Sequence, residues 1–236
     1  AIVAAALEIG AKPAGHWRGC HATPIDATAP SVGDLRLTDL TNRLSYLYGI
    51  MVNLQGKRFV DEGEDLGQYT YAKTGEAILN QPGSTAYQIF DQKTVGLLEK
   101  RYETGTPLVA NSIQELAAKL GLEPAALANT VQEFNRAVQD GEFNAALCDS
   151  KGTRGIEPPK SNWAQRLDSP PYLAYPVTGG ITFTFGGLEI DPQARVINTE
   201  DNPIPGLYAT GEITGKFFYH NYPGGTGLTS GAVFGK

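Results

Sequence analysis

Glycine is concentrated in the last quarter of the chain, from residue 179 to residue 236. The whole sequence has 236 residues with 28 glycines and 15 prolines, and in this segment they are interleaved with Ile, Leu, Val and aromatic residues without a repeat period. Glycine permits tight turns and close approach of the backbone to a ligand, and the apolar residues argue against disorder. We therefore expect the chemistry of the protein in this segment.

Composition limits the class of protein. A hydrophobic content of 41% can supply a core. No run of 18 apolar residues occurs and residues 1–9 lack the basic start of a signal peptide, which predicts neither membrane insertion nor export and favours the cytoplasm. The net charge of -6 argues against a nucleic-acid surface. Cys20 and Cys148 lack metal-ligand spacing, so we expect no metal site and no disulfide framework.

Hydrophobic periodicity and turn residues predict an α+β protein. Ser112 followed by Glu115 forms a capping box. The predicted helices cover residues 1–9, 69–79, 92–103, 112–120 and 123–138. The predicted strands are a hairpin over 48–60 with its turn at 55–56, and segments 86–91, 180–185, 188–191, 195–198 and 207–210. Residues 141–169 form an irregular connector.

Both ends of the chain fall inside predicted elements. The first helix has no N-cap residue before it, and the chain stops soon after a helix that begins near Thr226. We therefore expect the sequence to be truncated at its N-terminus and its last helix to be cut.

The most specific segments are PIPGLYATGEITG at 203–215 and HNYPGGTGLTSGAVFG at 220–235. They describe a strand end, a carboxylate at Glu212, and a glycine-rich turn that leads into a helix. A helix N-terminus offers free N–H groups to an anion, although such a turn can also bind phosphate or no ligand. Gly225-Thr226-Gly227 superficially matches a dinucleotide fingerprint, but no complete βαβ unit follows it, which excludes that interpretation.

These motifs resemble a known family. GGLEID at 186–191, PIPGLYATGE, the glycine-rich turn and VFG at 233–235 occur in the order found in the C-terminal part of FAD-dependent fumarate reductase and succinate dehydrogenase flavoproteins. GKRFVDE at 56–62, AIL at 77–79 and IFD at 89–91 resemble the capping domain of that family. The N-terminal Rossmann segment that binds the FAD pyrophosphate in the family is missing.

The resemblance implies a fold and a cofactor. Residues 46–170 would be a capping (substrate) domain, inserted into a Rossmann-like FAD-binding domain to which 1–45 and 171–236 contribute. Glu212 would bond a hydroxyl of the ribose or ribityl region, and backbone groups near Thr226 would meet the flavin pyrimidine edge; an exposed loop carboxylate is the alternative for Glu212. The residues implied to contact FAD are Gly211, Glu212, Gly224, Gly225, Thr226, Gly227, Leu228 and Thr229.

The substrate residues depart from the fumarate reductase pattern. Phe183 occupies the position of the family's substrate-binding histidine, and Tyr222 that of its substrate-binding arginine. Tyr71 occupies the position of the family's proton-shuttling arginine. One family histidine is retained, as His21. The segments ITFTFGG, PPKSNWA and HNYPGGTGLTSG instead resemble the tricarballylate dehydrogenase branch. The resemblance thus implies dehydrogenation of a small polycarboxylate, with proton abstraction next to a carboxylate, hydride transfer to flavin N5, and electrons passed to an acceptor protein or a quinone-linked partner.

Two alternatives stay open. The sequence Tyr222-Pro223-Gly224, with His220 two residues before the tyrosine, also resembles 3-ketosteroid dehydrogenases, in which a tyrosine at that place helps to polarise a substrate carbonyl. The other alternative is a non-catalytic fragment that binds no flavin by itself, because the Rossmann segment is missing.

Candidate catalytic residues are Tyr71, His21, His220 and Tyr222. The two histidines have the unperturbed pKa closest to neutrality and are candidate bases together with Tyr71. For substrate carboxylates the candidates are Arg154, Lys160, Arg166 and Thr184, since basic side chains bind carboxylate. A solvated basic loop is an equally good interpretation of the three cations.

Overall fold

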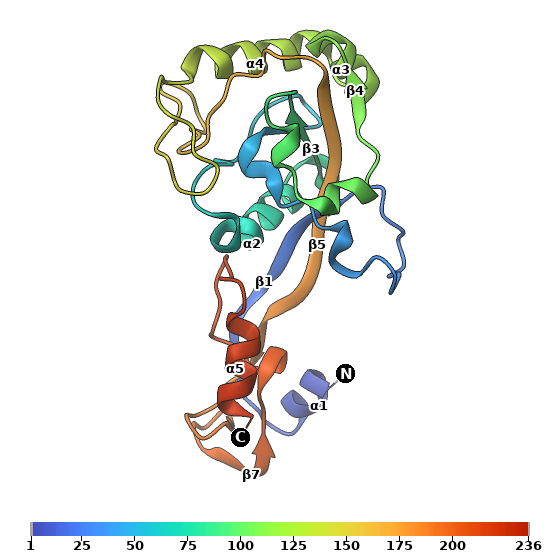
Figure 1. Cartoon of the computed structure of the whole chain (residues 1–236). Coiled ribbons are helices and arrows are strands. Elements are labelled where there is room, and N and C mark those ends of the chain that lie inside the picture. Colours follow the sequence, from blue (N-terminus) through green and yellow to red (C-terminus); the bar gives the residue numbers. More distant parts are fainter. Residues whose placement is uncertain (1, 236) are drawn as a thin grey trace.

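The computed structural model describes residues 2–235, so Ala1, the first residue of the first predicted helix, and Lys236 lie outside the described residues. Two long antiparallel strands, β1 (Pro13–Asp26) and β5 (Tyr172–Leu188), connect an upper body with a smaller lower part (Figure 1). The upper body contains α2, α3 and α4, and the lower part contains α1, β7 and α5.

One five-stranded sheet organises the upper body. Its order is β1-β5-β3-β2, and β4 also pairs with β5. The first half of β5 pairs with β3, from Leu173 to Thr178, and its second half pairs with β1, from Val177 to Leu188. The shorter strands are β2 (Ile50–Asn53), β3 (Thr85–Phe90) and β4 (Leu108–Ala110).

Three helices cover this sheet. α2 (Gly67–Leu79) lies along β1, and α3 (Ile113–Leu120) and α4 (Pro124–Ala137) form the top of the upper body. One half of the predicted capping box is confirmed: the Ser112 side chain accepts the Glu115 N–H at 3.1 Å, whereas the Glu115 carboxylate accepts the N–H of Asn111 instead of that of Ser112. Apolar residues of α3 and α4 pack on the sheet in the largest hydrophobic cluster, with the buried side chains Ile50, Ile89, Leu116, Leu127 and Phe134.

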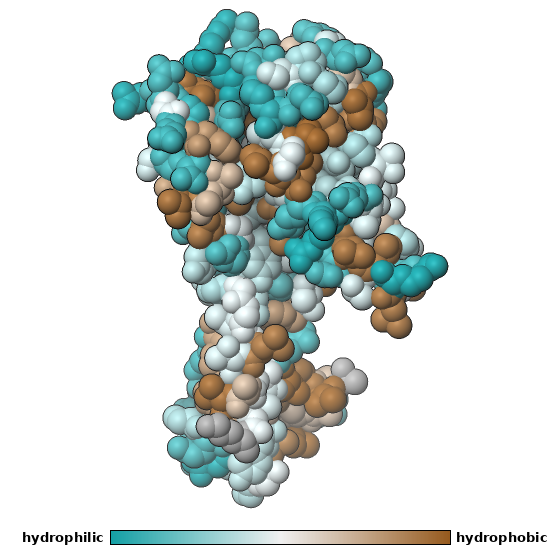
Figure 2. All heavy atoms as spheres, in the orientation of Figure 1, coloured by the Kyte–Doolittle hydropathy of each residue, from teal (hydrophilic) through white to brown (hydrophobic). Residues whose placement is uncertain are grey.

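The lower part has its own small core. α1 (Ile2–Glu8) packs against the antiparallel pair β6 (Arg195–Ile197) and β7 (Pro203–Tyr208) around buried Ala6, Leu188 and Val196. α5 (Thr226–Phe234) is apolar yet has no buried residue. Figure 2 shows apolar side chains on the surface of this part, where Ile2, Ile9, Leu228 and Val233 are exposed.

Two predicted elements were wrong. Residues 92–103 form two short 3-10 helices, Val95–Leu97 and Lys100–Thr104, instead of one α-helix. The Asp91 carboxylate accepts the Lys93 N–H, and such a local bond competes with helix formation. The hairpin over 48–60 keeps only its first strand, because β2 pairs with β3 and a single bridge, Val52 to Arg58, remains of the second strand.

The predicted strands of the glycine-rich segment differ in extent. The segment 180–185 lies within β5, a strand of 17 residues that ends at Leu188, so the strand predicted at 188–191 keeps only its first residue and a bridge at Ile190. The strand predicted at 207–210 is the end of β7, which begins at Pro203. The connector 141–169 has neither helix nor strand, as predicted. The division into domains at 45 and 170 stays a prediction. No helix within residues 2–235 has the length and apolar character needed to cross a membrane.

Candidate functional site: an aromatic cavity where the two parts meet

A cavity of about 650 Å³ opens where β1, α2, the last part of β5, the segment 211–222 that follows β7, and α5 converge. Beside it Ala72, Phe185 and Tyr222 form a small buried cluster. The residues lining the cavity are His21, Tyr71, Thr182, Phe183, Thr184, Gly211, Glu212, Thr214, Phe217, Phe218, Tyr222, Gly227, Leu228, Ser230 and Gly231.

His21 is the buried histidine of this cavity. Strand pairing places it opposite Phe183, and its ring centroid lies 4.9 Å from that of Phe183, 5.0 Å from Tyr71 and 4.3 Å from Tyr222. Burial lowers the pKa of His21 to about 4, so the imidazole is neutral at pH 7. Neither ring nitrogen has a hydrogen-bond partner in the described part of the chain. A buried polar group left without a partner is costly, which indicates a ligand or a catalytic role.

Tyr222 presents its phenol to the same cavity. The ring is buried, and its hydroxyl oxygen accepts the backbone N–H of Gly227 at 2.9 Å. Because the oxygen acts as acceptor in this bond, the hydroxyl hydrogen remains available for a ligand. A Cβ at Gly227 would lie 3.0 Å from that oxygen, so a side chain there would press on the phenol.

Tyr71 reaches the cavity from α2. Burial, followed by the nearby Tyr222, raises the pKa of Tyr71 to about 12, so this side chain is a neutral phenol at pH 7. Its position depends on Gly75, because a Cβ at Gly75 would overlap the carbonyl oxygen of Ala22 on β1. The missing side chain lets α2 approach β1 closely and brings Tyr71 against His21.

The opposite wall of the cavity carries polar groups suited to FAD. Glu212 accepts the Thr184 N–H at 3.3 Å and lines the cavity. The Ser230 hydroxyl is buried without a partner, and the Leu228 N–H, in the first turn of α5, has no acceptor among the described residues. A Cβ at Gly211 or Gly231 would meet open space. Free donors, a carboxylate and open backbone therefore fit the polar edges of the cofactor.

The other predicted FAD residues shape the turn before α5. The Gly224 N–H donates to the Gln68 carbonyl at 3.1 Å, and the Thr226 hydroxyl donates to the Pro223 carbonyl at 2.6 Å. Gly225 caps α5 in the left-handed region with φ 85°, and it accepts the Thr229 hydroxyl. None of these four residues (Gly224, Gly225, Thr226 and Thr229) is among those lining the cavity.

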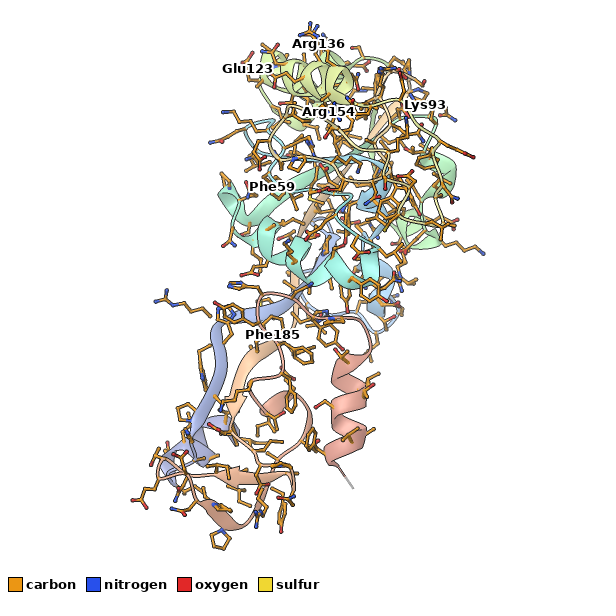
Figure 3. The ribbon with its side chains drawn as sticks, turned by 90° about the vertical axis from the view of Figure 1, so that its left-hand side faces the viewer. Phe59, Lys93, Glu123, Arg136, Arg154 and Phe185 are labelled. Atoms are coloured by element: carbon orange, nitrogen blue, oxygen red, sulfur yellow. The ribbon has the colours of Figure 1, made fainter. Side chains whose placement is uncertain are left out.

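The three predicted cations are not brought to the cavity. Figure 3 shows Arg154 in the upper body and Phe185 in the lower part. The Lys160 ammonium is buried, where it donates to the carbonyls of Leu47 and Gly49 at 2.7 and 2.9 Å, and burial lowers its pKa to about 8. Arg166 is exposed and donates to the Asn135 carbonyl at 3.1 Å. No Arg or Lys is found among the lining residues.

His220 is half exposed and lies outside the lining. Its Nδ1 is 3.0 Å from one Glu76 carboxylate oxygen and 3.2 Å from the other. Within residues 2–235, no group of three or more His, Cys, Asp or Glu side chains could hold a metal ion.

Two of the aromatic residues that line the cavity, Phe217 and Phe218, were not among the candidates predicted from the sequence. Phe218 packs on Tyr222 and Phe183 with centroid distances of 4.8 and 5.9 Å, and Phe217 also lines the cavity. The run KFFYH at 216–220, directly before the glycine-rich turn, was the available signal. Two adjacent aromatic residues beside a predicted ligand turn are typical of a wall that contacts the ligand.

The fold and site define a flavoprotein. The family model described as "FAD binding domain" matches residues 35–228, and the chain belongs to this family, among flavoproteins similar to fumarate reductase. FAD is therefore the cofactor of this chain.

The individual relatives include a fumarate reductase and two dehydrogenases that are named for a cyclic keto acid and a ketosteroid. The chain is 35% identical over 190 residues to "Fumarate reductase (cytochrome)" of Shewanella frigidimarina, covering 79% of this chain and 30% of the relative. It is 32% identical over 207 residues to "4-oxocyclohex-2-ene-1-carboxylate 5-dehydrogenase" of Sinomonas cyclohexanicum, covering 79% of this chain and 34% of the relative. The solved 3-ketosteroid delta1-dehydrogenase of Sterolibacterium denitrificans matches with a TM-score of 0.70 and 25% identity, over 99% of this chain and 44% of that one. The chain thus spans about a third of the curated relatives' length.

Proposed function

We propose that the chain is the substrate-facing part of a flavin-dependent dehydrogenase that introduces a double bond next to the carbonyl of a cyclic ketone. The observation that carries this proposal is the cavity lining: five aromatic side chains and one buried histidine, with neither Arg nor Lys. Such a wall suits an apolar ring, while a few polar groups orient its carbonyl.

Three residues of the cavity each have a separate role in the proposed reaction. The Tyr222 hydroxyl donates to the substrate carbonyl oxygen and stabilises the negative charge that develops there. The neutral His21 accepts the proton from the carbon next to the carbonyl, through a ring nitrogen that has no other partner. Tyr71, a phenol at pH 7, is a second donor. FAD, when bound, would supply the acceptor for the hydride of the neighbouring carbon, so that loss of the proton and the hydride together would leave a carbon–carbon double bond.

A tricarballylate substrate is less well supported. Three carboxylates would have to leave water, and burying a charge without a partner is unfavourable. The predicted partners Arg154, Lys160 and Arg166 are engaged or exposed elsewhere, and His21 carries no charge at pH 7. Relatives named for fumarate and for a cyclic keto acid cover the same share of this chain, so the choice of the ketone rests on the cavity lining. Transfer of electrons to an acceptor protein or a quinone-linked partner, and a cytoplasmic location, are parts of the same proposal.

A substrate panel tests this function. The full-length flavoprotein would be assayed with a dye acceptor against 4-oxocyclohexanecarboxylate, 4-androstene-3,17-dione, tricarballylate and succinate, and in reverse with fumarate. We expect one or both ketones to be oxidised with kcat/KM at least tenfold above any acid without a keto group. Faster turnover of tricarballylate, succinate or fumarate would contradict the proposal and restore the polycarboxylate function.

A further inference from the structure

The Glu76–His220 contact joins the loop that carries Tyr222 to α2, the helix that carries Tyr71. His220 Nδ1 lies 3.0 and 3.2 Å from the two carboxylate oxygens of Glu76, so a hydrogen on Nδ1 can be shared by both. Glu76 is one of the α2 residues beyond Tyr71, and His220 stands two residues before Tyr222. The contact therefore links the two phenols of the cavity from outside it.

His220 is held in a conformation that its backbone does not favour. Its φ is 57°, in the left-handed region that non-glycine residues adopt at a cost. The imidazole is flanked by His16 and Tyr219, with ring centroids 4.6 and 4.2 Å away. A strained residue persists only where its surroundings fix it, and here the fixing groups are these two rings and the Glu76 carboxylate.

The same loop has two further bonds to α2. The Asn221 side-chain amide donates to the Tyr69 carbonyl at 2.7 Å, and the Gly224 N–H donates to the Gln68 carbonyl at 3.1 Å. The Asn221 side-chain oxygen also accepts the Tyr222 N–H at 2.9 Å. Tyr222 thus stands between two anchored residues. Among the described residues, Glu76–His220 is the only hydrogen-bonded pair of side chains between the loop and α2, beside the packing of Tyr222 on Tyr71 and Ala72.

We propose that Glu76 and His220 are positioning residues, which hold the loop on α2 so that the Tyr222 hydroxyl stays at the Gly227 N–H and faces the substrate carbonyl. This inference rests on the proposed function of Tyr222. Neither residue touches the cavity, so their effect on turnover passes through Tyr222. The pair is partly exposed, and such pairs contribute about 0.2–1 kcal/mol, so loss of the contact lowers the ratio of correctly placed to displaced Tyr222 by about 1.4-fold to fivefold.

A double-mutant cycle in the full-length flavoprotein tests this inference. Glu76→Gln weakens the contact, because the amide is uncharged and keeps a single acceptor oxygen. His220→Asn removes the imidazole, and asparagine tolerates the left-handed backbone at 220. We expect each change to lower kcat by about 1.4-fold to fivefold with KM altered less, and to have no further effect when Tyr222 is already phenylalanine. Glu64→Gln is the matched control, because Glu64 forms an exposed pair with Lys73 away from the loop.

The outcomes separate this inference from the proposed function. If Glu76→Gln and His220→Asn leave kcat unchanged, or if their effects persist undiminished beside Tyr222→Phe, the positioning role is wrong. If Tyr222→Phe itself turns over normally, the proposed function fails first. Flavin content and melting temperature, measured for each variant, show whether a loss of kcat reflects unfolding; a variant that loses flavin or melts earlier by more than the Glu64→Gln control also counts against the inference.

Discussion

The rings of His21 and Tyr222 lie with their centroids 4.3 Å apart, one on the long edge strand β1 and the other on the loop before the last helix. The imidazole has two nitrogens without partners, and the phenol has a hydrogen to donate. A proton acceptor and a hydrogen-bond donor in contact, inside an otherwise aromatic cavity, are what dehydrogenation next to a carbonyl requires.

Replacing His21 by phenylalanine should stabilise the protein and inactivate it. Phenylalanine keeps the aromatic contacts with Tyr71, Phe183 and Tyr222 and removes two unsatisfied nitrogens, so we expect the free energy of unfolding to rise by about 1 kcal/mol at pH 7. Turnover should fall by about 10² to 10⁴, the usual contribution of a positioned base. Urea denaturation and a steady-state assay measure both quantities. A destabilised variant, or an active one, would show that His21 is only a packing residue.

The same histidine predicts how stability depends on pH. The folded pKa of His21 is about 4, whereas the unfolded value is about 6.5. Between these values the unfolded chain binds the proton and the folded chain does not, so the His21 contribution to stability is lost as the pH falls through this window. The loss should be on the order of 2 kcal/mol. Denaturation curves at pH 7 and pH 4.5 should differ by more in the wild type than in His21→Phe; equal differences would refute the shifted pKa.

Gly75→Ala tests whether the approach of α2 to β1 sets the position of Tyr71. The added methyl group would overlap the Ala22 carbonyl, so the helix must move, and overpacking of this kind costs about 1–3 kcal/mol. We expect a lower melting temperature and a lower kcat. Gly96→Ala is the control, because a Cβ there meets nothing within 4 Å, and its effect should stay within about 0.5 kcal/mol. Similar melting temperatures for both variants would exclude the close-packing argument.

Local signals in the sequence predicted α3, α4, the irregular connector and the helix at Thr226, because caps, prolines and glycines act over a few residues. β1 was not predicted. Its sequence PAGHWRGCHATPID has two prolines, two glycines and no regular alternation, and it becomes a strand through long-range pairing with β5, with register shifts after His16 and His21. Non-local pairing of this kind leaves no periodic signal in a single sequence.

The candidate site, too, could be predicted from the sequence only in part, because motifs are local and burial depends on long-range contacts. Motif position indicated His21, Tyr71 and Tyr222, and the structure brings all three together. The cations of the connector were chosen by charge alone, and charge does not reveal whether an ammonium is exposed or buried: Lys160 lies in the core because two carbonyls accept its hydrogens. Glu62, the last residue of GKRFVDE, is likewise fully buried and paired with Arg58.

The role of Tyr222 is the central claim, and anaerobic flavin bleaching tests it most directly. The full-length wild type and Tyr222→Phe, matched for flavin content, would be mixed with the preferred ketone while flavin absorbance is followed. Loss of one preorganised donor typically slows the chemical step about 10²- to 10³-fold, so bleaching should slow by that factor with a similar apparent affinity for the ketone. Equal bleaching rates in the two proteins would contradict the claim, as would bleaching by tricarballylate but by neither ketone.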